Sequence, residues 1–205
     1  MIAILLNGPP TAGKGVRGIE MEEYLDANRV LTSTVLEEDG HASEMRKGNM
    51  VEDHIVFESV TRRVIPGMNH IFDGFARTPE QATVFPKELR KLGFTQVITI
   101  ELNLTDEEIA LERRLKRKKD GDSNDRPDGD RKETFLKRFE RHNNQADEVR
   151  SILVHSCDHI FVVDTRKNQQ EIARLIQGYL KVALEGFGVF AKYRETDFMG
   201  DLSRT

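Results

Sequence analysis

An unbroken apolar run near the start of the chain, followed at once by a glycine-rich turn, constrains the fold more than any other feature. Residues 2–6 read Ile-Ala-Ile-Leu-Leu, the pattern of a strand buried on both faces of a parallel sheet. The turn at residues 8–14 has the spacing G-x-x-x-x-G-K, and a helical stretch follows it. Strand, glycine loop and helix in this order predict a fold of the α/β class.

Four further short apolar runs follow, separated by stretches long enough for a helix. They are residues 29–32, 70–73, 96–102 and 159–163. This alternation predicts a five-stranded parallel sheet flanked by helices. Apolar residues recur at helical spacing from Ile172 to Leu184, which predicts a surface helix that packs on the sheet.

Composition and charge exclude several classes of protein. The 205 residues carry 31 basic and 35 acidic side chains, and a net charge of −4 argues against a protein that coats nucleic acid. No apolar run approaches the roughly 20 residues that cross a membrane, and we expect neither a membrane span nor a signal peptide. The one cysteine, Cys157, can form no internal disulfide, so we expect a reducing, cytoplasmic location.

Positive charge is concentrated in one segment, residues 113–141, which holds twelve Lys or Arg against seven Asp or Glu. We expect this segment to meet anions. Within it, residues 119–130 hold no hydrophobic side chain, two glycines, a proline and five aspartates, which predicts an exposed loop. The glycine- and aromatic-containing tail at 186–205 either docks on the body or on a partner, or stays loose.

The loop at residues 8–14 has the chemistry of a phosphate site. Its glycines let backbone N–H groups face inward, the helix N-terminus adds positive potential, and Lys14 supplies a cation for the β and γ phosphates. The hydroxyl that usually follows the lysine and helps to hold magnesium is absent. The residues expected to bind ATP here are Gly8, Thr11, Ala12, Gly13, Lys14, Gly15 and Val16. The alternative interpretation is an ordinary strand-to-helix turn.

A second motif makes the interpretation more specific. Residues 73–78 read Asp-Gly-Phe-Ala-Arg-Thr, and Gln81-Ala82 follow at the spacing of the string D-G-F-P-R-T and Q-A. With Gly13-Lys14-Gly15 and residues 44–53, these strings resemble the nucleoside monophosphate kinases, adenylate kinase above all. The resemblance implies a P-loop NTPase fold over residues 1–185, with a reduced monophosphate-binding segment at 33–65 and a short lid without zinc at 119–131.

The resemblance also implies roles for single residues. The catalytic cations would be Lys14, Arg117, Arg126 and Arg138, with Lys137 as an alternative to the last. Arg113 would stack on the donor base. The acceptor would bind Thr34, Arg77 and Gln81, with Arg77 on its phosphate and Gln81 on its base. Asp73 would hold magnesium through water. The residues alone leave other interpretations open: a helix-capping Thr78 beside a surface Arg77, a buried Asp73 that caps a loop, and a solvated charged face at 107–119.

The segment after Ser33-Thr34 departs from the family string S-T-G-D-x-x-R. Leu36 stands where the acidic residue near magnesium is expected, and Asp39 stands where an arginine grips the acceptor phosphate. We therefore expect Asp39 to repel phosphate and to count against AMP as the acceptor.

Together these observations predict an ATP-dependent nucleoside monophosphate kinase that transfers the γ-phosphoryl group to a nucleoside or deoxynucleoside monophosphate, with AMP as one candidate, and that uses ATP and Mg²⁺. Phosphoryl transfer needs cations that position and stabilise spread charge, which explains the many arginines. The alternatives are a P-loop kinase for a different small acceptor and a nucleotide-binding module that has lost catalysis. We expect a monomer that binds small-molecule nucleotides, without nucleic acid or membrane partners.

Overall fold

The structure, a computed structural model, describes residues 1–120 and 132–185, apart from the side chains of Lys118 and Asp120. The tail predicted at 186–205 lies outside the described residues, as does most of the lid predicted at 119–131. The chain divides into two units, residues 1–166 and 167–205. The predicted site residues named above all belong to the first unit.

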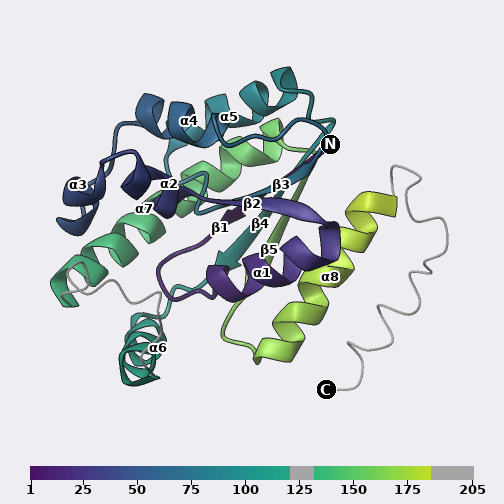
Figure 1. Cartoon of the computed structure of the whole chain (residues 1–205). Coiled ribbons are helices and arrows are strands. Elements are labelled where there is room, and N and C mark those ends of the chain that lie inside the picture. Colours follow the sequence, from purple (N-terminus) through teal and green to yellow (C-terminus); the bar gives the residue numbers. More distant parts are fainter. Residues whose placement is uncertain (121–131, 186–205) are drawn as a thin grey trace. The chain divides into compact units, whose positions relative to one another are not determined.

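Five strands form one parallel sheet in the first unit (Figure 1). They are β1 Ile2–Asn7, β2 Ala27–Leu31, β3 Asn69–Asp73, β4 Gln96–Asn103 and β5 His159–Asp164. They lie in the order β2-β3-β1-β4-β5, and each neighbouring pair is parallel. The predicted fold class is confirmed. One boundary was wrong, because Thr32, predicted to end the second strand, begins a helix.

Seven helices of the described residues connect these strands. They are α1 Lys14–Leu25, α2 Thr32–Glu38, α3 Ala42–Arg46, α4 Asp53–Thr61, α5 Pro79–Lys91, α6 Glu107–Asp120 and α7 Lys132–Ser156. In the second unit, α8 Gln169–Glu185 covers the amphipathic segment that the apolar spacing predicts to be helical. Its packing on the sheet stays a prediction. None of the described helices combines the length and the apolar character that a membrane span requires.

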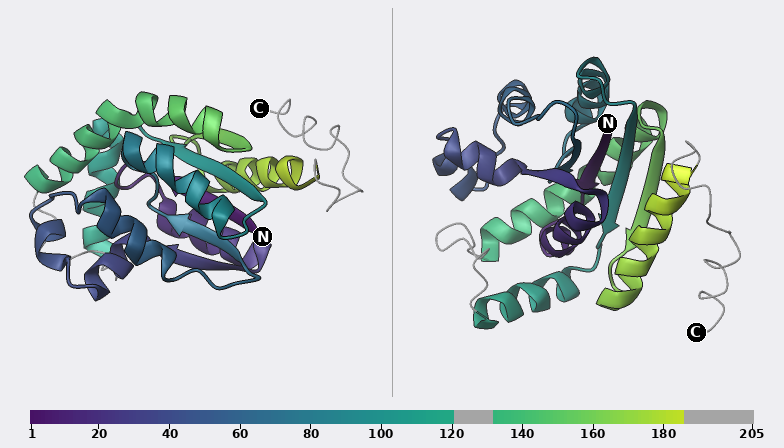
Figure 2. Two further views of the ribbon diagram at one scale, coloured as in Figure 1. Left: turned by 90° about the horizontal axis from the view of Figure 1, so that it is seen from above. Right: turned by 45° about the vertical axis from the view of Figure 1, so that its right-hand side comes forward.

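The sheet is covered on both faces (Figure 2), with α1 on one side and α4, α5 and α7 on the other. On the α5 side, Phe72 and Phe85 meet edge to face with ring centroids 5.0 Å apart, and Phe75 packs on Phe85 at 3.9 Å. All three are fully buried, and each such side chain contributes about 1.5–3 kcal/mol of transfer free energy. This aromatic core fixes α5 against β3, the strand that carries Asp73.

The order of the strands places one crevice at the carboxyl end of β1. From β1 the chain goes first to β2 and β3 on one side, and later to β4 and β5 on the other. Because the strand order reverses at β1, the connections on its two sides diverge and leave a crevice between them. Ligands of parallel sheets bind in such crevices. The loop at residues 8–13 leaves β1 at this point.

Candidate active site

The loop between β1 and α1 needs glycine at defined places. A side chain on Gly8 would place its Cβ 2.6 Å from the carbonyl oxygen of Leu102 in β4, so only glycine lets the loop pass this close. Gly13, just before α1, has a φ of 99°, and Thr11 has a φ of 64°. These left-handed residues turn the chain so that the loop leads into the N-terminus of α1, where free N–H groups favour anions.

Lys14, the first residue of α1, folds back over this loop. Its Nζ donates to the carbonyl oxygens of Gly8 at 2.6 Å and Pro9 at 2.8 Å. Burial lowers the pKa of the Lys14 ammonium from 10.5 to about 7, against a raising effect of Asp73, and the nearby Arg77 and Arg117 lower it further. Burial is thus the main reason that the charged form of Lys14 is disfavoured, and the neighbouring guanidinium groups add to it.

Two cavities meet at Lys14. The first, about 380 Å³ and here named the loop cavity, is lined by Pro10, Thr11, Gly13, Lys14, Gly15, Arg29, Leu31, Ser33, Thr34, Glu37, Asp73, Arg77, Arg114, Arg117, Phe135 and Arg138. The second, about 220 Å³ and here named the α7 cavity, is lined by Gly8, Pro10, Lys14, Ser33, Met45, Gly48, Asn49, Met50, Arg77, Arg138, Arg141, His142 and Gln145. The cations that line both are Lys14, Arg77 and Arg138.

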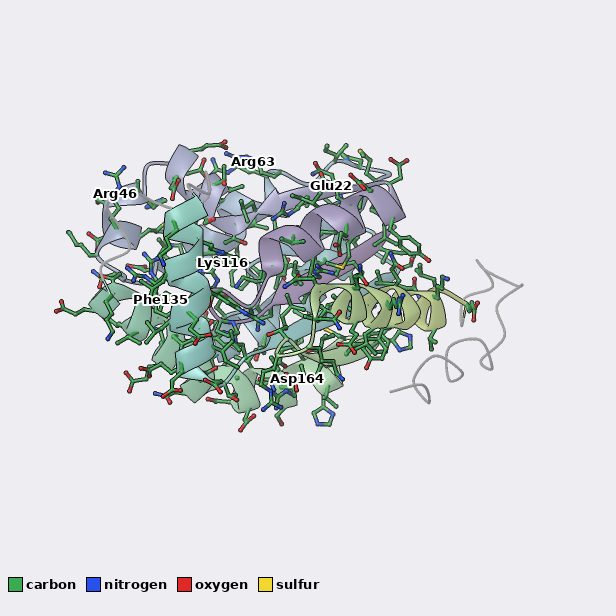
Figure 3. The ribbon with its side chains drawn as sticks, turned by 90° about the horizontal axis from the view of Figure 1, so that it is seen from below. Glu22, Arg46, Arg63, Lys116, Phe135 and Asp164 are labelled. Carbon is green, nitrogen blue, oxygen red and sulfur yellow. The ribbon has the colours of Figure 1, made fainter. Side chains whose placement is uncertain are left out.

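Side chains from α6 and α7 help to enclose the loop cavity. The guanidinium of Arg114 on α6 lies over the ring of Phe135 on α7, 5.6 Å from its centroid. Figure 3 views the molecule from below, with Lys116 labelled on α6, Phe135 on α7 and Arg46 on α3. The contact stacks a cation on an aromatic face and joins the two helices beside the cavity.

Arg77 is held by the turn that follows β3. Its Nε donates to the carbonyl of Gly74 at 2.6 Å, and a Cβ on Gly74 would lie 2.4 Å from Nη2 of Arg77. The Phe75–Ala76 peptide bond within this turn is cis. Thr78 caps α5 by accepting from the N–H of Gln81 at 3.1 Å. The capping interpretation of Thr78 is therefore correct, but Arg77 lines both cavities instead of the open surface.

Gln81 lies beside this turn but lines neither cavity. It is 1% exposed, and both of its polar atoms have protein partners. Its Oε1 accepts from the Arg77 N–H at 2.8 Å, and its Nε2 donates to Asp53 at 2.7 Å. In this structure the amide ties α5 to α4, and its reading of an acceptor base stays a prediction.

Two arginines of α7 reach across the α7 cavity to the segment around α3. Arg138 donates to the carbonyl of Met45, and Arg141 donates to that of Gly48 at 2.7 Å. Gly48 has a φ of 77°, and a Cβ there would lie 2.9 Å from Thr134, so this approach needs glycine. Arg138 lines both cavities, whereas Lys137, its predicted alternative, is exposed and lines neither.

His142, one turn further along α7, is a neutral member of the α7 cavity. Burial lowers its pKa from 6.5 to about 3, and the positive charges of Lys14, Arg77 and Arg150 add to the effect. Arg150 itself anchors α7 to the sheet, because it donates to both carboxylate oxygens of Glu101 in β4 at 2.8 and 2.6 Å. Sequence reasoning missed Arg141 and His142, although both follow Arg138 at helical spacing.

The other predicted residues are distributed as follows. Arg113 lines neither cavity, and its guanidinium donates to the carbonyls of Thr11 and Thr165. Ala12 is buried and Val16 is 49% exposed, and neither lines a cavity. The residues Thr11, Gly13, Gly15, Thr34, Arg117 and Asp73 line the loop cavity, and Gly8 lines the α7 cavity. Arg126 lies outside the described residues.

Arg29 is one of the loop-cavity residues that the sequence did not suggest, as are Glu37 and Arg114. Register pairs Arg29 of β2 with Ile71 and pairs Leu31 with Asp73, so Arg29 and Asp73 project from one face of the sheet as diagonal neighbours. The Nε of Arg29 donates to Oδ2 of Asp73 at 3.1 Å, and its Nη2 donates to the same oxygen. Asp73 is therefore both buried at a strand end and paired with a cation.

Comparison with known proteins tests the family resemblance. No family model matches the chain. Similar curated proteins include the adenylate kinase of Bacteroides thetaiotaomicron, 29% identical over 158 residues that cover 71% of this chain and 81% of that protein. The adenylate kinases of Thermus thermophilus and Leptospira biflexa are each 27% identical to this chain. Both alignments cover 71% of this chain, and they cover 79% of the Thermus protein and 82% of the Leptospira protein. The chain is related to the adenylate kinases.

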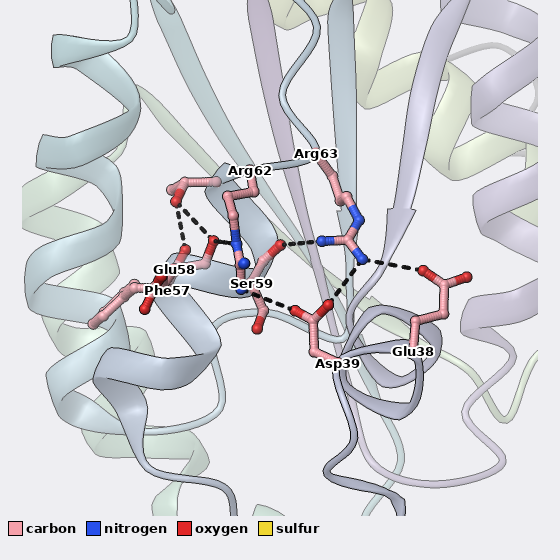
Figure 4. Close-up of polar contacts among 8 residues, drawn as sticks. Glu38, Asp39, Phe57, Glu58, Ser59, Arg62 and Arg63 are labelled. Atoms are coloured by element: carbon pink, nitrogen blue, oxygen red, sulfur yellow. Dashed lines mark hydrogen bonds and ion pairs between the residues drawn. The ribbon is translucent and has the colours of Figure 1, made fainter.

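One inference drawn from the adenylate kinase string was wrong. Asp39, at the end of α2, lines neither cavity and faces the end of α4 (Figure 4). It pairs with Arg62 at 3.2 Å and with Arg63 at 3.0 Å, so two guanidinium groups neutralise it. Leu36 is 5% exposed and belongs to the hydrophobic core. Asp39 therefore does not repel a phosphate in the site, and it is no evidence against AMP.

The described part of the chain offers few ligands for a magnesium ion beside Lys14. Gly15 and Val16 carry no hydroxyl, Leu36 is part of the core, and Oδ2 of Asp73 is bound by the Arg29 guanidinium. The described residues contain no group of three or more His, Cys, Asp or Glu side chains that could hold a metal. A divalent cation at Asp73 would also lie next to a like charge. These residues do not fit a magnesium site of the kind that the adenylate kinase resemblance implies.

Proposed function

We propose that this chain is an ATP-dependent nucleoside monophosphate kinase, and that the loop cavity takes the donor triphosphate while the α7 cavity takes the acceptor. The observation that carries the proposal is the set of cations, Lys14, Arg77 and Arg138, that lines both cavities. A phosphoryl group that passes from one cavity to the other would stay in contact with all three.

The geometry suits the charge that develops during transfer. The bond between the γ-phosphorus and the oxygen that bridges it to the β-phosphate breaks, and a bond from an acceptor phosphate oxygen to the same phosphorus forms. The products are ADP and a nucleoside diphosphate. The transition state is loose, with charge spread over the transferred oxygens, so fixed cations at the junction lower the barrier. Arginine also binds phosphate in a bidentate manner.

The two cavities differ in ways that match two different ligands. The loop cavity includes Gly13 and Gly15 at the start of α1, where backbone N–H groups can receive a chain of phosphates. The α7 cavity adds Arg141 for the acceptor phosphate, with Met45 and Met50 as apolar surface for the rest of the molecule. Any Mg²⁺ would enter as part of the substrate MgATP.

A kinase with a different small phosphorylated acceptor is the second candidate. The buried Gln81, whose amide is bound to Arg77 and Asp53, favours it, because no base-reading group at that position faces either cavity. The smaller cavity still offers cations for an acceptor phosphate. A cytoplasmic monomer that acts on small nucleotides stays our prediction in either case.

The test is an ADP-release assay with ATP and Mg²⁺ across all nucleoside and deoxynucleoside monophosphates, with other phosphorylated small molecules in parallel and a control without acceptor. Turnover with a monophosphate supports the proposal, and turnover with a non-nucleotide acceptor alone supports the second candidate. Tight ATP binding without turnover on any acceptor refutes both kinase functions and leaves the nucleotide-binding module.

A further inference from the structure

The loop cavity contains a cation–carboxylate pair that the proposed phosphoryl transfer does not use. Arg29 and Asp73 both line this cavity, and their side chains are only 14% and 2% exposed. Nε and Nη2 of Arg29 both donate to Asp73. Within the described part of the chain, no hydrogen bond is found for Nη1 of Arg29. One edge of the guanidinium thus remains able to bind a ligand in the cavity.

The path of the Arg29 side chain depends on the helix beside it. Arg29 passes over α1 at Gly18, and a Cβ on Gly18 would lie 2.5 Å from its Nε and 2.8 Å from its Cζ. Gly18 lies within the helix, where glycine costs about 1 kcal/mol relative to alanine. The missing side chain therefore leaves room for the guanidinium to reach Asp73 and the cavity.

The charge of the loop cavity matches a triphosphate that carries no metal. Its lining has six cationic side chains against two acidic ones, an excess of four positive charges when Lys14 is protonated. A nucleoside triphosphate with all its phosphates ionised carries about four negative charges, about one each on the α- and β-phosphates and close to two on the terminal phosphate. The protein thus supplies positive charge that a divalent cation would otherwise bring.

We propose that Arg29 is a further triphosphate-binding residue, which stands beside Asp73 where the resemblance would place a hydrated magnesium ion, so that nucleotide binding depends little on divalent cations. The inference rests on the proposed function, because it assumes a nucleoside triphosphate in the loop cavity. It concerns binding, and it leaves the metal requirement of the transfer step to be measured separately.

The test measures the Kd of a fluorescent N-methylanthraniloyl derivative of ATP, once in EDTA and once with excess Mg²⁺. Arg29→Met alone would leave Asp73 buried without a partner, which destabilises folds. The informative comparison is therefore between Asp73→Asn and the double variant Arg29→Met/Asp73→Asn, where no buried carboxylate remains. Arg62→Met is the matched control, because it loses the same charge at a 56% exposed site outside both cavities.

We expect the wild-type Kd in EDTA to lie within about tenfold of the Kd with Mg²⁺, a difference below about 1.4 kcal/mol. In EDTA the double variant should bind at least about tenfold more weakly than Asp73→Asn, while Arg62→Met binds like the wild type. The inference is wrong if Mg²⁺ lowers the wild-type Kd by more than about tenfold. It is also wrong if the double variant and Asp73→Asn have the same Kd in EDTA. Absence of binding in both conditions overturns the proposed function, and this inference falls with it.

Discussion

Lys14 allows the electrostatics of the loop cavity to be tested by counting protons. Burial lowers the pKa of its ammonium to about 7, with Asp73 acting in the opposite direction and Arg77 and Arg117 adding to the decrease. At pH 8, one unit above this pKa, about nine in ten free molecules carry a neutral Lys14. A bound triphosphate surrounds the amine with negative oxygens and raises the pKa of Lys14 well above 8. Binding at pH 8 should therefore take up about 0.9 proton per nucleotide.

Isothermal titration calorimetry measures this uptake directly. The binding enthalpy of ATP at pH 8 is determined in two buffers with different ionisation enthalpies, and the slope gives the number of protons exchanged. The terminal phosphate of the nucleotide is already ionised at pH 8, since phosphate esters have a second pKa near 6. The Lys14→Met variant serves as control and should show no uptake. Zero uptake in the wild type, or equal uptake in the variant, would refute a buried, neutral Lys14 at the triphosphate site.

Three further substitutions test separate contacts. Gly74→Ala places a Cβ 2.4 Å from the Arg77 guanidinium, so kcat/KM for the acceptor should fall by about 10–100-fold. The Kd for ATP should rise by a smaller factor, because five other cations line the loop cavity, and an equal loss of donor affinity would contradict this. Asp39 lies outside both cavities, so Asp39→Ala should turn over within about twofold of the wild type in steady-state kinetics. A larger increase in turnover would mean that Asp39 does repel the acceptor phosphate. The pKa of His142 is about 3 in the folded protein against 6.5 in the unfolded chain, so the unfolded chain binds more protons below pH 6.5. The free energy of unfolding, measured with denaturant, should therefore fall more steeply with decreasing pH in the wild type than in His142→Gln. Parallel curves would argue against a buried neutral imidazole.

The fold was predictable because its signals are local. Ala3, Ile4, Leu5 and Leu6 are fully buried, as an unbroken apolar run indicates, and the glycine loop follows it immediately. The boundary error at Thr32 has the same origin. Threonine is a β-branched residue that suits a strand, but its position at the turn into α2 is decided by tertiary contacts that the local pattern does not contain.

The site was predictable only where a motif carries it. Lys14 and Arg77 line the cavities because the string around each of them joins a strand end to a helix start. Arg117 lies near the end of α6 and was predicted from the family resemblance. Arg29 could not be found in this way, since its partner Asp73 is 44 residues away and only sheet register brings them together. A cation in the middle of a short predicted strand was the signal that could have been noticed.

Asp39 was wrongly predicted for a different reason, because the family string was matched to a segment with a different local structure. The linear match assumed that α2 presents the same positions to the site as the family string does. In the structure, Val35 and Leu36 form the buried face of α2, and the helix ends at Glu38. Asp39 then faces the two arginines that follow α4, Arg62 and Arg63, and accepts hydrogen bonds from both. Helical spacing of the apolar residues would have predicted that Leu36 is part of the core.

The most direct measurement follows the γ-phosphoryl group itself. Enzyme in excess is mixed with ATP labelled at the γ-phosphorus, Mg²⁺ and a monophosphate acceptor, and the products of a single turnover are separated for the wild type and for Lys14→Met. We predict that the wild type moves the label into a nucleoside diphosphate and that the variant leaves it in ATP. Label that stays in ATP with every monophosphate, or that leaves only as inorganic phosphate, would contradict transfer between two cavities joined by Lys14, Arg77 and Arg138.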